Sequence, residues 1–209
     1  MSPDWNDIEQ RLRTRLTPVT QIDAQMARSD RDLNPEWQDT TAKSEYRHAA
    51  VLAPIIKRPD AWTMLLTQRA ADLPSHAGQV AFPGGRVDAG DLTAVDTALR
   101  EAHEEVGLEP RFVEPLGAIE PYETGTGFRI APIVGFVTPG FEQKMDTREV
   151  ADIFEVPFAF LMDPANHERR ETEWRGQMRS YYAMPYEDRF IWGATAGMIR
   201  ALYERLYVG

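Results

Sequence analysis

Hydrophobic residues recur at helical spacing in two places along the chain. Near the start, apolar residues at every fourth position predict an amphipathic helix over residues 4–16. Near the middle, steps of three and four residues predict a second helix over residues 93–106, and Gly107 stands where a helix would end. The residues that set these patterns are Ile8, Leu12 and Leu16 in the first helix and Val95, Ala98, Leu99, Ala102 and Val106 in the second.

Compact apolar runs of strand length lie between and after these helices. Residues 49–56 and 62–67 are two such runs, and Arg58, Pro59 and Asp60 between them favour a turn. The pair is therefore predicted to form a hairpin. Further strands are expected over residues 113–119 and 128–137, and a late hairpin over residues 178–184 and 190–192.

Helical patterns return towards the end of the chain. Residues 158–162 favour a short helix, and residues 194–206 favour a closing helix. Residues 147–155 are ambiguous, and the polar stretch 17–47 fits either an extended arm or an ordered loop. Because strands come before and after the central helix without strict alternation, we predict an α+β fold with helices packed on a mixed sheet.

Composition narrows the possible partners. The 209 residues suit one domain with extra elements, and the formal net charge is -10. Nucleic acids and anionic membranes are bound through basic clusters, so neither is an expected partner. The chain has no cysteine, which excludes a disulfide, a thiolate metal site and a cysteine nucleophile. With mixed charges at the start and no long apolar run, we expect a cytoplasmic protein.

The predicted central helix carries three glutamates and an arginine. Glu101, Glu104 and Glu105 share one helical face, and Arg100, four residues before Glu104, can orient it. Such clusters are most often simply solvated. Three carboxylates on one rigid face nevertheless suit a hard divalent cation such as Mg²⁺ or Mn²⁺.

A glycine pair precedes this helix and changes the picture. Gly84 and Gly85 allow a close backbone approach that can serve a metal or a phosphate. The spacing that follows resembles the Nudix box. Five residues separate Gly85 from Asp91, and eight more separate Asp91 from the run at residues 100–108. The box usually has Glu where Asp91 stands and a gap one residue shorter after it. Both departures resemble the Nudix branch that cleaves coenzyme A and its derivatives.

This resemblance implies a fold, a metal site and a reaction. The fold is a mixed β-sheet sandwiched between α-helices. Glu101, Glu104 and Glu105 would bind Mg²⁺ or Mn²⁺, the carbonyl of Gly84 would add a ligand, and Arg100 would orient the glutamates. The implied reaction is attack of a metal-activated water on a phosphorus of a diphosphate.

Upstream of the box, residues 65–85 resemble a second signature, that of the coenzyme A pyrophosphatase branch. The positions that match are Leu65, Leu66, Thr67, Arg69, Gly78 and 82–85. Ala70 stands where that signature has Ser, and Pro74 where it has an Arg that could contact phosphate. The likeness runs from about residue 47 onward, so we assign residues 47–209 to a Nudix domain and residues 1–46 to an N-terminal helix and arm.

The same stretch supplies candidate substrate contacts. Arg69 fits a phosphate clamp, but it would serve equally well in an ion pair with a nearby acid. The resemblance also assigns contacts to Gly78, Gln79, Phe82 and Gly85, although Gln79 could simply brace the loop. His76 is a further candidate base or hydrogen-bonding group, and a structural loop histidine is its alternative.

A catalytic base is sought beyond the box. In several Nudix enzymes a glutamate from a later loop takes this role, and Glu149 is the choice here, with Glu101 and Glu120 as rivals. The alternative for Glu149 is an acid at a helix N-terminus. The aromatic residues Trp192, Tyr181 and Tyr182 would either stack on a nucleobase or belong to the core.

Three functions compete. The first is hydrolysis of coenzyme A or acyl-coenzyme A to phosphopantetheine and adenosine 3',5'-bisphosphate. The second is hydrolysis of another nucleoside diphosphate derivative, such as NADH, ADP-ribose or an ADP-sugar. The third is a non-catalytic nucleotide sensor, which the complete glutamate set disfavours. The expected partner is a small nucleotide diphosphate, and a homodimer through the N-terminal helix is one hypothesis.

Overall fold

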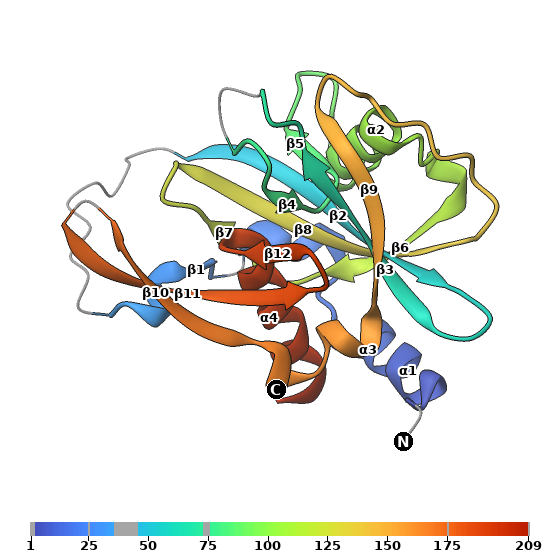
Figure 1. Ribbon diagram of the computed structural model, residues 1–209. Helices are drawn as coiled ribbons and strands as arrows, with labels where there is room; N and C mark the ends of the chain where they lie inside the picture. Colours follow the sequence, from blue (N-terminus) through green and yellow to red (C-terminus); the bar gives the residue numbers. More distant parts are fainter. Residues whose placement is uncertain (1–2, 25, 36–45, 73–75, 175, 209) are drawn as a thin grey trace.

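The structure is a computed structural model that describes residues 3–24, 26–35, 46–72, 76–174 and 176–208 (Figure 1). The helices are α1 (Trp5–Arg15), α2 (Ala94–Val106), α3 (Phe158–Leu161) and α4 (Ala194–Tyr207), with 3-10 turns η1 (Val19–Ala24), η2 (Asp30–Leu33), η3 (Pro110–Phe112) and η4 (Pro164–Asn166). The strands are β1 (Arg28–Ser29), β2 (Arg47–Lys57), β3 (Trp62–Arg69), β4 (Val80–Ala81), β5 (Gly84–Arg86), β6 (Val113–Ala118), β7 (Tyr122–Glu123), β8 (Phe128–Val137), β9 (Val150–Pro157), β10 (Glu168–Trp174), β11 (Gln177–Tyr186) and β12 (Arg189–Trp192).

Strands β2 and β8 form the centre of a nine-stranded sheet. The order is β1-β7-β8-β2-β3-β4, with β5 paired to β2, β6 to β8 and β9 to β3. The β2–β8 and β1–β7 pairs are parallel and the others antiparallel, so the sheet is mixed, as predicted. The hairpin expected at residues 49–56 and 62–67 is the β2–β3 pair, in which Ile55 faces Met64.

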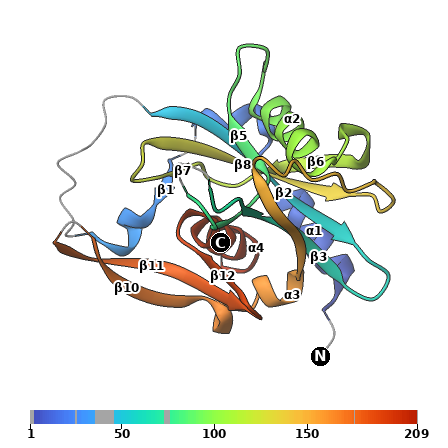
Figure 2. The same cartoon turned by 45° about the horizontal axis from the view of Figure 1, so that its top comes forward.

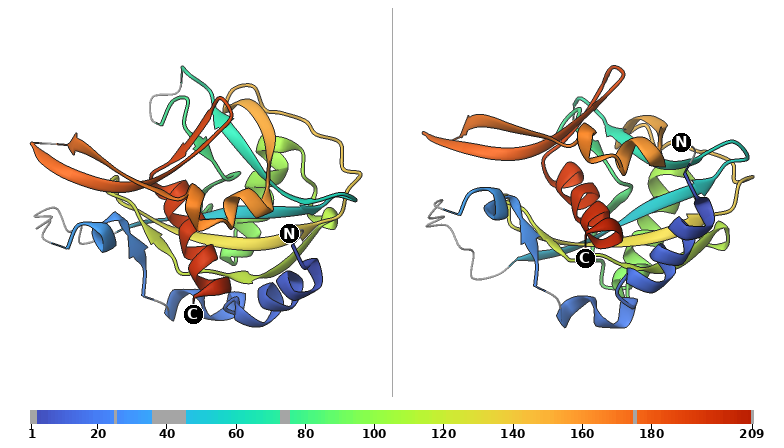
Figure 3. Two further views of the ribbon diagram at one scale, coloured as in Figure 1. Left: turned by 60° about the horizontal axis from the view of Figure 1, so that its bottom comes forward. Right: turned by 90° about the horizontal axis from the view of Figure 1, so that it is seen from below.

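The two faces of β2 are covered by different helices. Its residues are buried from Ala49 to Ile56, as in a strand enclosed on both sides. Leu52 packs in the cluster that contains α2, and Ile55 packs in the cluster that contains α4. Helices α2 and α4 accordingly lie on opposite sides of the sheet, as Figures 2 and 3 show. The predicted layering of a mixed sheet between helices is confirmed.

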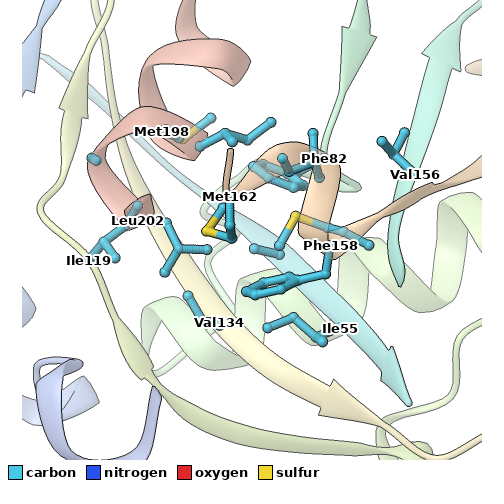
Figure 4. Close-up of a cluster of buried hydrophobic side chains, with 14 of the residues drawn as sticks. Ile55, Phe82, Ile119, Val134, Val156, Phe158, Met162, Met198 and Leu202 are labelled. Atoms are coloured by element: carbon cyan, nitrogen blue, oxygen red, sulfur yellow. The ribbon is translucent and has the colours of Figure 1, made fainter. Parts of the chain in front are cut away.

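The core on the α4 side joins segments far apart in the sequence. Figure 4 shows Phe158 and Met162, from α3 and its C-terminal end, beside Met198 and Leu202 of α4 and Ile55 of β2. Phe158 is completely buried. Burial of one such side chain contributes about 1.5–3 kcal/mol to stability. This packing fixes α4 against the sheet and so places the start of α4 beside the pocket described below.

Helix α1 confirms the helix predicted over residues 4–16. Asp4 caps it, accepting hydrogen bonds from the N–H groups of Asn6 and Asp7. Its apolar residues Ile8 and Leu12 are buried within the chain's own core. The apolar stripe of α1 is therefore used inside this chain and is not left exposed for a second copy.

The polar stretch 17–47 contains ordered structure in its described part. Strand β1 pairs in parallel with β7, and η2 follows with a capping box between Ser29 and Asp32. The side chain of Asn34 exchanges hydrogen bonds with the backbone of Ser180 at 2.7 and 2.9 Å. These contacts attach residues 28–34 to the rest of the fold.

A second, three-stranded sheet has the order β10-β11-β12. The late hairpin predicted at residues 178–184 and 190–192 is confirmed as β11–β12, whereas β10 was not predicted. The ambiguous residues 147–155 contain the start of strand β9, which pairs with β3. No helix in the described part of the chain is long and apolar enough to span a membrane.

Candidate active site

A pocket of about 710 Å³ lies between the central sheet, α2, the β7–β8 turn and the start of α4. One wall carries Glu101 and Glu104 of α2 together with Glu149 from the loop before β9. The lining also includes Phe128, at the start of β8, and Trp192, at the end of β12. The pocket therefore joins an acidic wall to apolar and aromatic surfaces.

Helix α2 presents its glutamates in a fixed phase because both of its ends are defined. Thr93 and Asp96 form a capping box at the start, and Gly107 ends the helix in the left-handed conformation with φ 74°. A side chain at Gly107 would also meet the backbone of Lys144. The apolar stripe predicted for this helix packs towards β2, with Ala98 fully buried. This packing fixes where the glutamates project.

Arg100 connects the acidic residues of α2. Its Nη1 donates to Glu101 at 2.9 Å and to Glu104 at 3.2 Å, and its Nη2 donates to the carbonyl of Arg86 at 3.0 Å. Burial raises the pKa of Glu101, and the Arg100 guanidinium partly offsets this rise. The sequence predicted that Arg100 orients Glu104, and the structure places Arg100 in contact with both Glu104 and Glu101.

Asp91 anchors Arg100 from the other side. Its carboxylate accepts from Nε and Nη2 of Arg100 at 3.1 and 2.9 Å, from the Thr97 hydroxyl at 2.8 Å and from the Asp88 N–H at 2.9 Å. Arg100 and these further donors hold the pKa of Asp91 well below its usual range. Asp91, the residue that departs from the Nudix box, therefore positions the arginine that holds the glutamates.

Glu105 lies behind the pocket wall and is 3% exposed. Its Oε2 accepts one hydrogen bond, from the N–H of Gly84 at 3.1 Å. Burial raises the pKa of Glu105 to about 8, a rise that the Gly84 N–H and the Arg69 charge oppose. A carboxylate this buried and this poorly satisfied is stabilised by any cation brought next to it.

The glycine pair supports the two inner glutamates. Gly84 bonds to Glu105, and a methyl group at Gly85 would overlap the carboxylate of Glu101. A methyl group at Gly84 would overlap the carbonyl of Ala50 in β2. Both glycines line the pocket. The absence of a side chain at these positions is what lets the loop lie against the helix and the sheet.

Arg69, at the end of β3, reaches the pocket beside Glu105. Its Nη1 lies 3.8 Å from Oε1 of Glu105, beyond hydrogen-bonding distance. Its Nε is buried without a hydrogen-bond partner among the described residues. A buried N–H with no acceptor is costly, so the described residues leave this side chain incompletely satisfied. Arg69 lines the pocket, and its role as a phosphate clamp stays a prediction beside the ion pair with Glu105.

Only some of the other predicted substrate contacts line the pocket. Gln79 and Phe82 line the pocket, with Phe82 almost fully buried. Gln79 is also 2.9 Å from the ring of His76, so the two brace each other at the rim. Gly78 is not among the pocket-lining residues, and its N–H donates to the carbonyl of Arg69. Pro74, where the coenzyme A signature has Arg, lies outside the described residues.

Glu149 lies at the pocket, where the sequence placed a candidate base. Its backbone carbonyl accepts from the N–H of Ala70 at 2.9 Å, which ties its loop to the end of β3. Because strand β9 follows it, the alternative of a helix N-terminal acid is wrong. The rival Glu120 forms an ion pair with Arg205 of α4 and does not line the pocket.

The three aromatic candidates differ in whether they lie at the pocket or in the core. Trp192 is 36% exposed and lines the pocket, and Tyr181 packs edge-on against it with ring centroids 5.6 Å apart. Tyr182 instead packs against the hydrophobic core, under the guanidinium of Arg200. Trp192 is therefore the candidate for stacking on a nucleobase.

Several pocket residues carried no sequence prediction. Asp30 of η2 accepts a 2.5 Å hydrogen bond from the Tyr122 hydroxyl and pairs with Arg179 of β11, and all three line the pocket. Arg86 and Phe128 also line it. Nothing in the sequence pattern marks Asp30, but Arg86 directly follows the glycine pair, and that adjacency was a usable signal.

The donor set fits a hard divalent cation. Among the described residues, no three His, Asp or Glu side chains converge on one metal position as they stand, because Arg100 holds Glu101 and Glu104 while Glu105 bonds to Gly84. The chemistry nevertheless suits Mg²⁺ or Mn²⁺: Glu101, Glu104 and Glu105 project from one face of α2, and burial raises the pKa of Glu105.

Sequence comparison identifies the family. The NUDIX domain profile matches residues 46–180, more than half of the chain. The chain belongs to the Nudix family. It is 43% identical over 157 residues to an uncharacterized Nudix hydrolase, NudL, of Escherichia coli, covering 75% of this chain and 81% of the relative. To NudL of Photorhabdus laumondii it is 44% identical over 162 residues, covering 78% and 86%. The protein is thus a Nudix hydrolase, an enzyme of a family that generally depends on divalent metals and acts on nucleoside diphosphate derivatives.

Solved structures agree on the fold. The Nudix hydrolase RenU of Mycobacterium smegmatis superimposes with a TM-score of 0.50 and 18% identity, covering 78% of this chain and 87% of that one. At this identity the likeness establishes the shared Nudix architecture only. The substrate has to be inferred from the residues of the pocket.

Proposed function

We propose that this Nudix hydrolase cleaves the pyrophosphate bond of coenzyme A or acyl-coenzyme A, giving phosphopantetheine and adenosine 3',5'-bisphosphate, with Mg²⁺ or Mn²⁺. The observation that carries this proposal is the composition of one pocket. Acidic residues, Arg69 and aromatic residues line the same volume of about 710 Å³. A diphosphate ester of a nucleoside needs all three: carboxylates for a metal, a cation for the phosphates and an aromatic surface for the base.

In this proposal, Glu101, Glu104 and Glu105 hold the metal, with the Gly84 carbonyl as a further ligand and Arg100 fixing two of the carboxylates. A bound divalent cation neutralises charge that develops on the phosphate oxygens and lowers the pKa of a water molecule. The protein's own contribution is to position the metal-binding carboxylates. Their order on one rigid helix, set by caps and packing, keeps the carboxylates in place without reorganisation.

Two further side chains take roles at the diphosphate. Arg69, which lines the pocket, donates from its guanidinium to a phosphate oxygen and so orients the bond to be cleaved. Glu149, which lines the pocket, accepts a proton at its carboxylate from the attacking water. Trp192 offers an exposed ring for the nucleobase.

A different nucleoside diphosphate derivative is the alternative substrate. The carboxylates and Arg69 would serve NADH, ADP-ribose or an ADP-sugar equally well, because these share the diphosphate. A non-catalytic sensor is disfavoured by the intact set of glutamates on α2.

The experiment is a substrate panel analysed by mass spectrometry. The purified protein is incubated with coenzyme A, an acyl-coenzyme A, NADH, ADP-ribose and an ADP-sugar, each with Mg²⁺, with Mn²⁺ and with a chelator. We expect metal-dependent release of adenosine 3',5'-bisphosphate from the coenzyme A compounds. Consumption of NADH or ADP-ribose while coenzyme A stays intact would reject the substrate. Equal turnover with chelator would reject the metal mechanism.

A further inference from the structure

A second cationic site lies beside the acidic wall, on Arg86 of β5. Its backbone is fixed, because its carbonyl accepts from Nη2 of Arg100 at 3.0 Å and its strand pairs with β2 opposite Ala49. Arg86 lines the pocket and is exposed, and its guanidinium has neither a hydrogen bond nor an ion pair to any described residue. In a chain with net charge -10, an arginine without an acidic partner at a pocket is a candidate anion site.

The ring of Phe128 fixes the position of this guanidinium. The central carbon of the Arg86 guanidinium lies 5.4 Å from the ring centroid, within cation–π range. A second guanidinium, that of Arg47, lies 4.0 Å from the same centroid and donates to the carbonyl of Thr126 at 3.1 Å. Two like charges at one ring repel each other, and an anion bound to both relieves that repulsion. Stacking on the ring also limits the side-chain entropy lost when a ligand binds.

This site is separate from the groups proposed for the diphosphate. Arg69 projects from the end of β3, next to Glu105, whereas Arg86, Arg47 and Phe128 come from β5, β2 and β8. A ligand that carries only a diphosphate engages the metal-binding glutamates and Arg69. A ligand with an additional phosphate monoester has a second group to place, and a guanidinium fork matches phosphate oxygens.

We propose that Arg86, supported by Phe128 and Arg47, binds a phosphate monoester on the nucleoside half of the substrate, apart from the diphosphate that is cleaved. This inference rests on the proposed function and sharpens it. Coenzyme A carries such a monoester on its ribose, whereas NADH, ADP-ribose and ADP-sugars do not. The site therefore selects for a 3'-phosphorylated adenosine over an unphosphorylated one.

The test compares two substrates that differ only in that phosphate, coenzyme A and 3'-dephospho-coenzyme A. In Arg86→Ala we expect KM for coenzyme A to rise about tenfold or more, the effect of losing a charge-assisted hydrogen bond, with KM for dephospho-coenzyme A unchanged. Arg86→Lys should recover part of the loss, because it keeps the charge without the fork. The control is Arg111→Ala, because Arg111 is exposed, pairs with Glu109 and does not line the pocket.

Two kinetic outcomes would overturn the inference. An equal rise in KM for both substrates would place Arg86 at the diphosphate, and no change for either would leave it without a role in binding. Thermal unfolding of each variant checks that the fold is retained. Since the Arg86 side chain is exposed and makes no hydrogen bond within the described part of the chain, we expect little change in melting temperature.

A binding measurement separates this inference from the proposed function. Calorimetry compares adenosine 3',5'-bisphosphate with adenosine 5'-monophosphate on the intact protein and on Arg86→Ala. A preference for the bisphosphate that disappears in Arg86→Ala supports the site even if coenzyme A is not cleaved, in which case only the substrate is wrong. Equal affinity of the intact protein for both nucleotides overturns the site.

Discussion

Asp91, just before α2, and Glu105, in its last turn, are carboxylates in opposite situations. Asp91 accepts four hydrogen bonds, two of them from Arg100, and its pKa is lowered. Among the described residues Glu105 accepts one, from Gly84, and burial raises its pKa to about 8. Its place at the C-terminal end of the helix adds to the cost of its negative charge, because the helix dipole is negative there.

This difference indicates that Asp91 supports the structure of the site, whereas Glu105 is available to bind a ligand. The guanidinium of Arg100 balances the negative charge of Asp91, so this end of the helix is stable without a bound ligand. The fold leaves Glu105 buried and undersatisfied, which is tolerable if a cation from outside completes the environment. Arg100 links Asp91 to the other two glutamates, because it bonds to Asp91 on one side and to Glu101 and Glu104 on the other.

The largest effect is expected at the metal-binding end. Glu105→Gln should lower kcat/KM about a thousandfold, since loss of a metal-binding carboxylate removes on the order of 4 kcal/mol of transition-state stabilisation. Glu104→Gln should behave similarly. Steady-state kinetics with Mg²⁺ measures this, with Glu109→Gln, outside the pocket, as the matched control. Near-normal turnover in Glu105→Gln would show that the buried carboxylate is not a ligand.

An intermediate effect is expected at the supporting end. Asp91→Asn weakens the ion pair that holds Arg100 in place. We therefore expect kcat to fall about ten- to a hundredfold, as for a residue that orients metal ligands. Stability should fall by about 1–2 kcal/mol, because partly buried charge-assisted hydrogen bonds are lost. Urea unfolding and Mg²⁺ titrations of activity measure both. If Asp91→Asn lost stability while metal affinity and kcat stayed normal, the link through Arg100 would be wrong.

The smallest effect is a pH dependence of stability in the metal-free protein. Glu105 has a higher pKa folded, about 8, than its ordinary 4.5, so the folded state holds more protons between these values. The free energy of unfolding therefore falls as pH rises from about 4.5 to about 8. Melting temperatures in chelator should show this decline, and Glu105→Gln should flatten it. Mg²⁺ should restore stability most at the alkaline end, and an identical profile in both proteins would contradict the raised pKa.

Much of the central architecture was predictable from local pattern. The β2–β3 hairpin, α2 and its C-terminal Gly107 follow from apolar periodicity and turn chemistry, and each was found where expected. The missed strand β10 has the sequence ERRETEW up to Trp174, which lacks the apolar alternation of a half-buried strand. It forms only because β11 is there to pair with it.

The pocket was predictable only in part. Glu101, Glu104 and Glu105 share a helical face by spacing alone, and their distance from Gly84 and Gly85 in sequence is short. Asp30 reaches the same pocket from the N-terminal arm, across more than 90 residues to Tyr122. Such contacts depend on the parallel pairing of β1 with β7, which no local pattern encodes.

By itself, the sequence determined the helix that carries the glutamates, the glycine pair that lies against it and the family to which the chain belongs. These depend on residue spacing and on backbone freedom, which are local properties. Only the tertiary structure decided which carboxylate has its charge balanced by hydrogen bonds and which is buried without such partners. Burial and hydrogen bonding between distant segments set the charge balance of Asp91 and Glu105, and neither can be read from spacing. The free guanidinium of Arg86 beside Phe128 became visible for the same reason.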